Sequence, residues 1–319
     1  MKKNILVCAA ALAACLAYAK KVPSTEALPD LTGLYGPEVK TIGIAAISSV
    51  VPLERFSAVT NRLSKAGYRM KVASNVPGRS VAPAEVRARN LEALWLDPEV
   101  DLIVFAYGGK GAVDVVECLD WEKLKTRDMP VIGFSDLTML VNTMLAKGVG
   151  HPYTGPVLTT LGYSNGAAVT RMRDMMNGCP KNVKLRVVKG ADKTVEGLPM
   201  GGLLDRLHRL TVAGKLPDTA GRVIFIENTN GYAKRTDEML GDMITKGAFE
   251  KAAAVVICDF NSKSPKAETR AKLADFAAKI PCPVFSGFPY GHIANTALVD
   301  FRRKLTIDAG GVLVWAQGK

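Results

Sequence analysis

The chain has 319 residues, 48% of them hydrophobic and 23% charged, which excludes an intrinsically disordered protein and suffices for two ordinary domains or one large one. The formal net charge of +12 favours anionic partners such as cell-wall polymers or lipid head groups, although it also fits a merely soluble basic surface. The basic residues are spread along the chain without a long Lys/Arg block or an RNA-binding motif, which argues against nucleic acid as the partner.

The first 19 residues have the layout of a secretory signal peptide. Lys2 and Lys3 give a positive start, an apolar run covers Ile5 to Leu16, and the segment Ala17-Tyr18-Ala19 is a small-x-small cleavage site. The run is shorter than the roughly 20 apolar residues of a transmembrane helix, and no later segment reaches that length. Residues 12–15, Leu-Ala-Ala-Cys, also resemble a bacterial lipobox, which would leave a lipidated Cys15. We therefore expect an exported protein, periplasmic or lipid-anchored, with both cleavage modes open. A buried N-terminal helix of a cytoplasmic protein is the alternative.

Four cysteines follow the signal segment, and none of them stands in a C-x-x-C pair, which argues against a zinc site. They are Cys118, Cys179, Cys258 and Cys282. Structural thiols are the simplest interpretation, with Cys258 and Cys282, on or beside strands, acting as small hydrophobic groups. A Cys258–Cys282 disulfide after export stays open, because sequence alone cannot show it.

From Thr41 onward, apolar runs alternate with amphipathic helical patterns, which predicts a parallel sheet with helices on both faces. Strands are expected at Thr41–Ile47, Arg69–Ala73, Asp101–Ala106 and Pro130–Phe134. Helices are expected at Pro52–Ala66, Pro83–Leu96, Gly111–Leu119 and Asp136–Ala146. These elements predict an N-terminal domain over residues 41–165.

The pattern is less regular between Leu161 and about Val195, and we interpret residues 166–195 as the connection to a C-terminal α/β domain over 196–319. The connection holds an expected helix at Asn165–Asn177 and a strand at Lys184–Val188. Beyond it, helices are expected at Leu203–Ala213, Thr236–Lys246 and Lys266–Ala278. Strands are expected at Arg222–Ile226, Ala253–Cys258 and Val284–Phe285, followed by an alternating tail, Thr296–Val314, typical of edge strands.

The segment MPVIGFSDLTML indicates a strand, a sharp turn and a helix, with Ser135 at the turn. This is close to the G-x-S-x-G nucleophile elbow, although Leu137 stands in place of the second glycine. The turn would expose the Ser135 hydroxyl at a helix N-terminus, where the amide of Asp136 would point toward a developing oxyanion. An ordinary helix cap formed by Ser135 or Asp136 is the structural alternative.

A second glycine-rich turn follows the strand DLIVFA, in the order Tyr107-Gly108-Gly109-Lys110-Gly111. Such loops aim backbone amides at anions. The segment fits neither the dinucleotide fingerprint nor the phosphate-binding loop pattern. We expect Gly108 or Gly109 to supply a second oxyanion donor, with a plain tight turn as the alternative.

The chain contains three histidines, so an imidazole base must be one of them. His208 lies among basic residues of a helix and is expected at the surface, whereas His151 begins the turn-rich segment HPYTGP. His292 follows a short strand in the loop SGFPYGHIAN, directly after a glycine, and loops at the carboxyl ends of parallel strands are where such sheets place ligands. Glu227 ends the strand RVIFIE and could orient an imidazole, with a structural salt bridge as the alternative.

Taken together, these segments resemble the bacterial LD-carboxypeptidase family, which includes the microcin-immunity peptidases. The matching segments run from about Thr41 to Val299 and are IGIAAISS, DPEVDLIVFAYGGKGA, VIGFSDLT, GGLLDRL, GRVIFIEN and GFPYGH. The resemblance implies a Rossmann-like N-terminal sheet and a smaller mixed α/β C-terminal domain, with the active site at their junction.

The resemblance also implies that Ser135, Glu227 and His292 form a catalytic triad, with the oxyanion bound by Asp136 and by Gly108 or Gly109. The implied reaction is the release of a terminal D-alanine from a murein tetrapeptide, without metal or cofactor. The segment YGGKG departs from the family's usual Arg-Gly-Gly-Tyr-Gly, and HPYTGP and Asn228-Thr229-Asn230 depart as well. Two alternatives stay open, an amidase for peptidyl or aminoacyl nucleotides and an exported, non-catalytic wall-peptide-binding protein. A homodimer is also left open.

Overall fold

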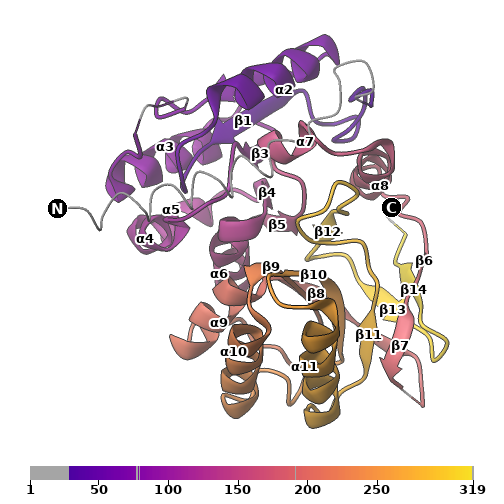
Figure 1. Ribbon diagram of the computed structural model, residues 1–319. Coiled ribbons are helices and arrows are strands. Elements are labelled where there is room, and N and C mark those ends of the chain that lie inside the picture. Colours follow the sequence, from indigo (N-terminus) through magenta and orange to yellow (C-terminus); the bar gives the residue numbers. More distant parts are fainter. Residues whose placement is uncertain (1–28, 77, 79, 191, 318–319) are drawn as a thin grey trace.

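The computed structural model describes residues 29–317 except 77, 79 and 191 (Figure 1). The predicted signal peptide, residues 1–19, and the lipobox cysteine Cys15 lie outside the described residues. Within the described part of the chain, no helix is both long and apolar enough to cross a membrane.

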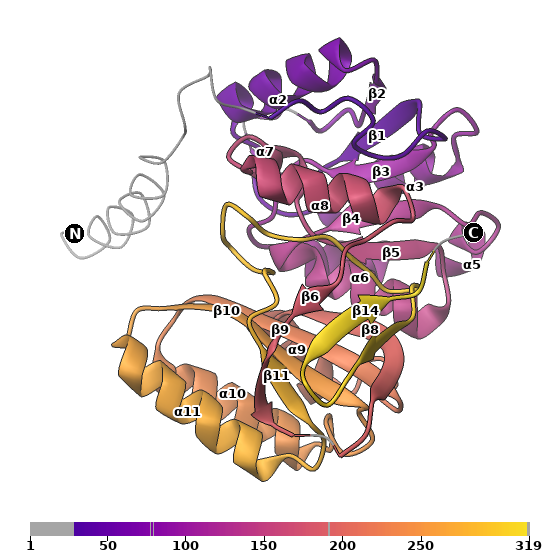
Figure 2. The same ribbon diagram turned by 90° about the vertical axis from the view of Figure 1, so that its right-hand side faces the viewer.

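The first sheet has six strands in the order β12-β5-β4-β3-β1-β2, all parallel except β12. These strands are β1 (Thr41–Ala45), β2 (Arg69–Val72), β3 (Leu102–Phe105), β4 (Pro130–Gly133), β5 (His151–Thr154) and β12 (Val299–Asp300). The associated helices are α2 (Leu53–Lys65), α3 (Ala84–Leu96), α4 (Ala112–Cys118), α5 (Trp121–Leu124), α6 (Thr138–Lys147), α7 (Leu158–Leu161) and α8 (Gly166–Met176). Helices α2, α7 and α8 cover one face, and α3 to α6 cover the other (Figures 1 and 2).

The second sheet has eight strands in the order β6-β14-β13-β8-β9-β10-β11-β7. Its four central strands are parallel, and antiparallel strands flank them on both sides. The strands are β6 (Val183–Lys184), β7 (Arg186–Lys189), β8 (Val195–Leu203), β9 (Arg222–Gly231), β10 (Ala254–Ser262), β11 (Val284–Ser286), β13 (Leu305–Ile307) and β14 (Val312–Trp315). Helices α9 (Leu204–Val212), α10 (Ala233–Thr245) and α11 (Lys266–Lys279) complete this half. The arrangement confirms the predicted α/β class, with a parallel sheet first and a mixed sheet second.

Several elements differ from the sequence-based expectation. Segment 151–154, expected as loop, is the parallel strand β5 and pairs with β4. Strand β8 was not expected, because its sequence VEGLPMGGL contains glycines and a proline that weaken a strand pattern. Strand β9 continues four residues beyond Glu227, so this glutamate lies within the strand and not at its tip. In segment 166–195, helix α8 is followed by β6 and β7, which lie in the second sheet.

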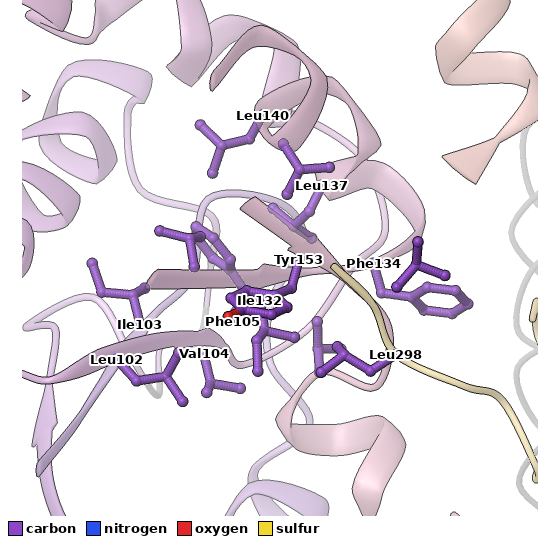
Figure 3. Packing of buried hydrophobic residues seen from close by; sticks show 14 of the residues in the cluster. Leu102, Ile103, Val104, Phe105, Ile132, Phe134, Leu137, Leu140, Tyr153 and Leu298 are labelled. Carbon is purple, nitrogen blue, oxygen red and sulfur yellow. The ribbon is translucent and has the colours of Figure 1, made fainter. Parts of the chain in front are cut away.

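The buried strands of the first sheet support the turn that carries Ser135. Phe105 and Ile132, from β3 and β4, have no exposed surface, and Figure 3 shows them packed with Leu137, Tyr153 and Leu298. Burying a large apolar side chain contributes roughly 1.5–3 kcal/mol. Because Leu298 comes from the C-terminal part of the chain, the core beneath Ser135 is built from both halves.

The two sheets meet at the first turns of helix α6. Gly201 and Gly202 on β8 have φ angles of +139° and +137°, and a Cβ atom on Gly202 would lie 2.7 Å from Cγ2 of Thr138. This close approach allows the Leu203 amide to donate a hydrogen bond to Thr138 Oγ1 over 3.0 Å, while Asn142 Nδ2 donates to the Gly201 carbonyl over 2.9 Å. Both α6 side chains are fully buried, so β8 is fixed directly below the Ser135 turn.

The four cysteines downstream of the signal segment are free thiols in the structure. Cys282 is buried, Cys258 is half-buried, and Cys118 and Cys179 are exposed. The disulfide left open between Cys258 and Cys282 is therefore not formed.

Candidate active site

Ser135 lies on a strained turn between β4 and α6. Phe134 is still extended, with φ at −151°, and Ser135 then adopts a left-handed φ of +60°. A non-glycine residue in this region costs of order 1–3 kcal/mol, which the surrounding packing must offset. Gly133 is required just before the turn, because a Cβ atom there would lie 2.8 Å from Cβ of Leu137. The turn leaves the serine side chain partly exposed while its neighbours are buried.

Ser135, His292 and Glu227 form one hydrogen-bonded chain. Nε2 of His292 lies 3.0 Å from Oγ of Ser135, and Nδ1 of His292 lies 3.0 Å from Oε2 of Glu227. A carboxylate only accepts hydrogen bonds, so Nδ1 carries the proton and Nε2 is free to accept from the serine. The Glu227 side chain has no exposed surface, whereas the His292 side chain is 18% exposed. Residues from positions 135, 227 and 292 are thus brought together as expected.

The imidazole is held in place by its own loop. The His292 ring packs against the Phe134 ring at a centroid distance of 4.7 Å. The preceding Gly291 has a φ of +140°, and its amide donates to Oγ1 of Thr296 over 3.1 Å. Tyr290 is fully buried, and its hydroxyl lies 2.6 Å from Oγ1 of Thr154 on β5. These contacts fix the loop relative to the Ser135 turn.

The glycine-rich loop lies directly against Ser135. A Cβ atom on Gly108 would be 3.1 Å from Cβ and 3.4 Å from Oγ of Ser135. Gly109 has a φ of +113°, and the amide of Lys110 donates to Oγ of Ser49 over 3.0 Å. The loop therefore brings Gly108 and Gly109 to the serine, next to Asp136 in the short 3-10 turn (Ser135–Leu137) that precedes helix α6. Their action as oxyanion donors remains a prediction.

The side chain of Asp136 has a role that the sequence analysis did not assign. It is 2% exposed, and its Oδ2 accepts hydrogen bonds from Ser48 Oγ over 2.7 Å and from the Ala112 amide over 2.9 Å. Its Oδ1 accepts from Nε of Arg206 over 2.6 Å. One buried carboxylate thus ties the nucleophile turn to the loop after β1, to the end of the glycine-rich loop and to helix α9. The sequence hint for this contact is that the segments VIGFSDLT and GGLLDRL carry opposite charges, at Asp136 and Arg206.

The other two histidines are bound elsewhere. Nε2 of His151 lies 2.6 Å from Oδ1 of Asp300, which joins β5 to β12. His208 was expected at the surface, and this expectation is wrong, because the residue is 8% exposed and its Nε2 lies 2.8 Å from Oδ2 of Asp242 on α10. Basic residues flank His208 in the sequence, but they do not place its own side chain at the surface. Neither histidine belongs to the chain of hydrogen bonds at Ser135.

Several titratable groups lie close to Glu227 and interact with its negative charge. Burial, together with the nearby Glu227 charge, raises the pKa of the Asp259 carboxyl. Burial and the same charge raise the pKa of the Cys258 thiol and of the Tyr290 hydroxyl well above their usual ranges.

Neither a metal-ligand cluster nor a large cavity marks the position of these residues in the described part of the chain. Over the described ranges, no three His, Cys, Asp or Glu side chains gather in a way that could hold a metal ion. Two cavities of about 360 and 450 Å³ are lined by other side chains, the first beneath α8 and the second between α4 and α6. The site is therefore defined by hydrogen-bonding geometry and not by cavity size.

A hydroxyl, an imidazole and a buried carboxylate joined in this order on an α/β fold define the serine-hydrolase class of site. Sequence profiles of the LD-carboxypeptidase N-terminal domain and C-terminal domain match residues 42–154 and 196–307. The chain belongs to the LD-carboxypeptidase family of serine peptidases.

Individual relatives agree with this assignment. A Bacillus subtilis protein described as a "probable murein peptide carboxypeptidase" is 23% identical over 286 residues, covering 84% of this chain and 88% of its own. The microcin C7 self-immunity protein of Escherichia coli is 22% identical over 312 residues, covering 84% and 90%. The crystal structure of a muramoyltetrapeptide carboxypeptidase from Oxalobacter formigenes has a TM-score of 0.78 at 23% identity, covering 86% of this chain and 97% of that one. At this identity the structural likeness shows the fold.

Proposed function

We propose that this chain is a serine carboxypeptidase that cleaves an L,D-amide bond and releases the terminal D-alanine of a murein tetrapeptide. The observation that carries the proposal is the hydrogen-bonded chain Ser135–His292–Glu227, with both bonds at 3.0 Å. Membership of the LD-carboxypeptidase family supports the substrate class, as do relatives named for murein peptides.

In the proposed reaction, Nε2 of His292 takes the proton of the Ser135 hydroxyl while Oγ attacks the carbonyl carbon of the scissile amide. Glu227 stabilises the resulting imidazolium through Nδ1. The amides of Asp136 and of Gly108 or Gly109 bind the oxyanion of the tetrahedral intermediate. The imidazolium then protonates the leaving D-alanine nitrogen, and water activated by His292 releases the acyl group from Ser135.

The test is the release of D-alanine from purified murein tetrapeptide, measured for the wild-type protein and for Ser135→Ala. We expect the variant to lose roughly four to six orders of magnitude in kcat, the range found for other triads. The matched control is Ser57→Ala on the exposed side of helix α2, which should leave the rate unchanged. Undiminished D-alanine release by Ser135→Ala would refute the proposal. Tetrapeptide binding without release by the wild type would favour the wall-peptide-binding alternative.

A second candidate keeps the chemistry and changes the substrate to a peptidyl or aminoacyl nucleotide. Similarity to the microcin C7 self-immunity protein, also seen in a structure with a TM-score of 0.75 at 19% identity, supports it. Comparing kcat/KM for murein tetrapeptide with kcat/KM for an aminoacyl sulfamoyl adenosine separates the two. A higher value for the nucleotide would replace the murein assignment.

We also propose that the protein is exported, on the evidence of the signal-like residues 1–19. Expression with and without these residues, followed by cell fractionation, tests export. Mass spectrometry of the purified N-terminus distinguishes cleavage after Ala19 from a lipid-modified Cys15. An intact Met1 on a protein confined to the cytoplasm would refute export.

A further inference from the structure

Two carboxyl oxygens next to the imidazole are buried without a hydrogen-bond partner. They are Oε1 of Glu227 and Oδ2 of Asp259, both among the few such side-chain atoms in the described part of the chain. A buried polar atom without a partner is rare and calls for a physical explanation. The other oxygen of Glu227 is already bound to His292, so the unpartnered one points elsewhere.

The fold places these two side chains beside each other. They stand on the neighbouring parallel strands β9 and β10, which lie side by side in Figures 1 and 2. The strand register is regular up to Ile257, opposite Ile226, and resumes at Phe260, opposite Asn228. Residues 258 and 259 therefore both face the single position of Glu227, as in a β-bulge.

Gly291 shows how close the approach is. A Cβ atom on this glycine would lie 2.7 Å from Cβ of Asp259 and 3.4 Å from Cβ of Glu227. Both side chains thus begin next to the residue that precedes His292. The Asp259 amide also donates to the Tyr290 carbonyl over 3.0 Å, which anchors Asp259 to the histidine loop.

The two carboxyl groups stand on neighbouring strands, each with one buried and unpartnered oxygen, so they repel each other when both are ionised. Glu227 accepts the hydrogen bond from His292 and is the better site for the negative charge. Burial and the Glu227 charge raise the pKa of Asp259, while His292 and Lys266 of helix α11 act in the opposite direction. The other titratable groups around the Glu227 carboxylate, Cys258 and Tyr290, are neutral because burial raises their pKa values.

We propose that Asp259 is a positioning residue that carries a proton in the resting protein and donates it as a hydrogen bond toward Oε1 of Glu227. One proton then satisfies both unpartnered oxygens and leaves a single negative charge facing the imidazole. It also fixes the rotamer of Glu227 and, through Oε2, the orientation of His292. The protonation of Asp259 does not depend on the proposed function, whereas its effect on turnover rests on that function.

The first test is infrared spectroscopy of the resting wild-type protein, Asp259→Asn and the control Asp242→Asn. Asp242 is a suitable control because it also pairs with a histidine but is 57% exposed. We expect a protonated-carboxyl band at pH 7 in the wild type and in Asp242→Asn, and its loss in Asp259→Asn. A band that persists in Asp259→Asn, or that is absent from the wild type, overturns the proposal. This measurement needs no substrate, so it stands even if the proposed activity fails.

The second test is the pH profile of kcat/KM for D-alanine release by Asp259→Asn and Asp259→Leu. The asparagine amide can still donate to Glu227, so Asp259→Asn should stay within about threefold of the wild type. Leucine leaves Glu227 Oε1 unpartnered, and its rate should fall about tenfold with a shifted acid limb. Full activity and an unmoved profile for Asp259→Leu, or equal losses in both folded variants, contradict the positioning role.

Discussion

The contact between Arg206 and Asp136 can be tested by replacing Arg206 with methionine, which keeps most of the side-chain volume and removes the charge. Asp136 is 2% exposed and Arg206 is 11% exposed, so the change leaves a buried carboxylate without its cation. Breaking a buried ion pair from one side costs about 3–5 kcal/mol. Ser48 and the Ala112 amide still donate to Asp136, so we expect about 3 kcal/mol, at the low end of that range.

The assay is urea unfolding followed by circular dichroism, with the free energy of unfolding extrapolated to water. The control is Arg209→Met on the same helix, where the pair with Asp205 is 3.3 Å long and the arginine is 58% exposed. Such a surface pair contributes at most about 1 kcal/mol. The double variant Asp136→Asn with Arg206→Met removes the uncompensated charge and should recover part of the loss. Equal losses for the Arg206 and Arg209 variants, or no recovery in the double variant, would show that the buried pair does not hold the turn.

Three further predictions concern the junction, the triad and pH. Gly202→Ala should destabilise the protein by about 3 kcal/mol, because its φ is +137° and its Cβ would meet Thr138. The control Gly241→Ala lies in an exposed helical position with no atom within 4 Å of the added Cβ, so it should be neutral or stabilising in the same urea assay. Glu227→Gln should lower kcat for D-alanine release by about three to four orders of magnitude, because a neutral amide cannot stabilise the imidazolium. The circular dichroism spectrum should be unchanged, and a near-normal kcat would remove Glu227 from the mechanism. Because the pKa of Asp259 is raised in the folded state, the wild type should lose stability relative to Asp259→Asn as pH rises above about 4. A difference in melting temperature between the two proteins that stays constant from about pH 4 to about pH 8 would contradict this shift.

The sequence was sufficient to predict the parts of the site that depend on short local patterns. The strand-turn-helix pattern around Ser135 and the glycine preceding His292 are encoded within a few residues, and both stand where expected. Glu227 was placed at a strand tip, but β9 continues to Gly231, because the extension comes from pairing with β10 and not from local apolar alternation. Partners of His151 and His208 could not be predicted, since Asp300 and Asp242 are distant in sequence.

Arg206 and Asp259 were not predicted as parts of the site, because their partners are distant in the sequence. Arg206 looks like one of several basic residues on an amphipathic helix, and only the packing of α9 beside the Ser135 turn turns its side chain toward Asp136. Asp259 stands in a continuous strand pattern, and the register shift that brings it to Glu227 depends on the partner strand. Opposite charges in VIGFSDLT and GGLLDRL hint at the first pair, but both contacts are tertiary and periodicity carries no signal for them.

Strand β12 has a consequence for biosynthesis. Val299 and Asp300 pair with Thr154 and Tyr153, so the sheet that carries the serine turn acquires its last strand from a segment that follows strand β11 of the second sheet. A nascent chain still lacking those residues leaves the hydrogen-bonding edge of β5 uncovered. Translation must therefore continue past the central strands of the second sheet before the nucleophile-bearing half can close, and products terminated before Val299 should be inactive and prone to aggregate.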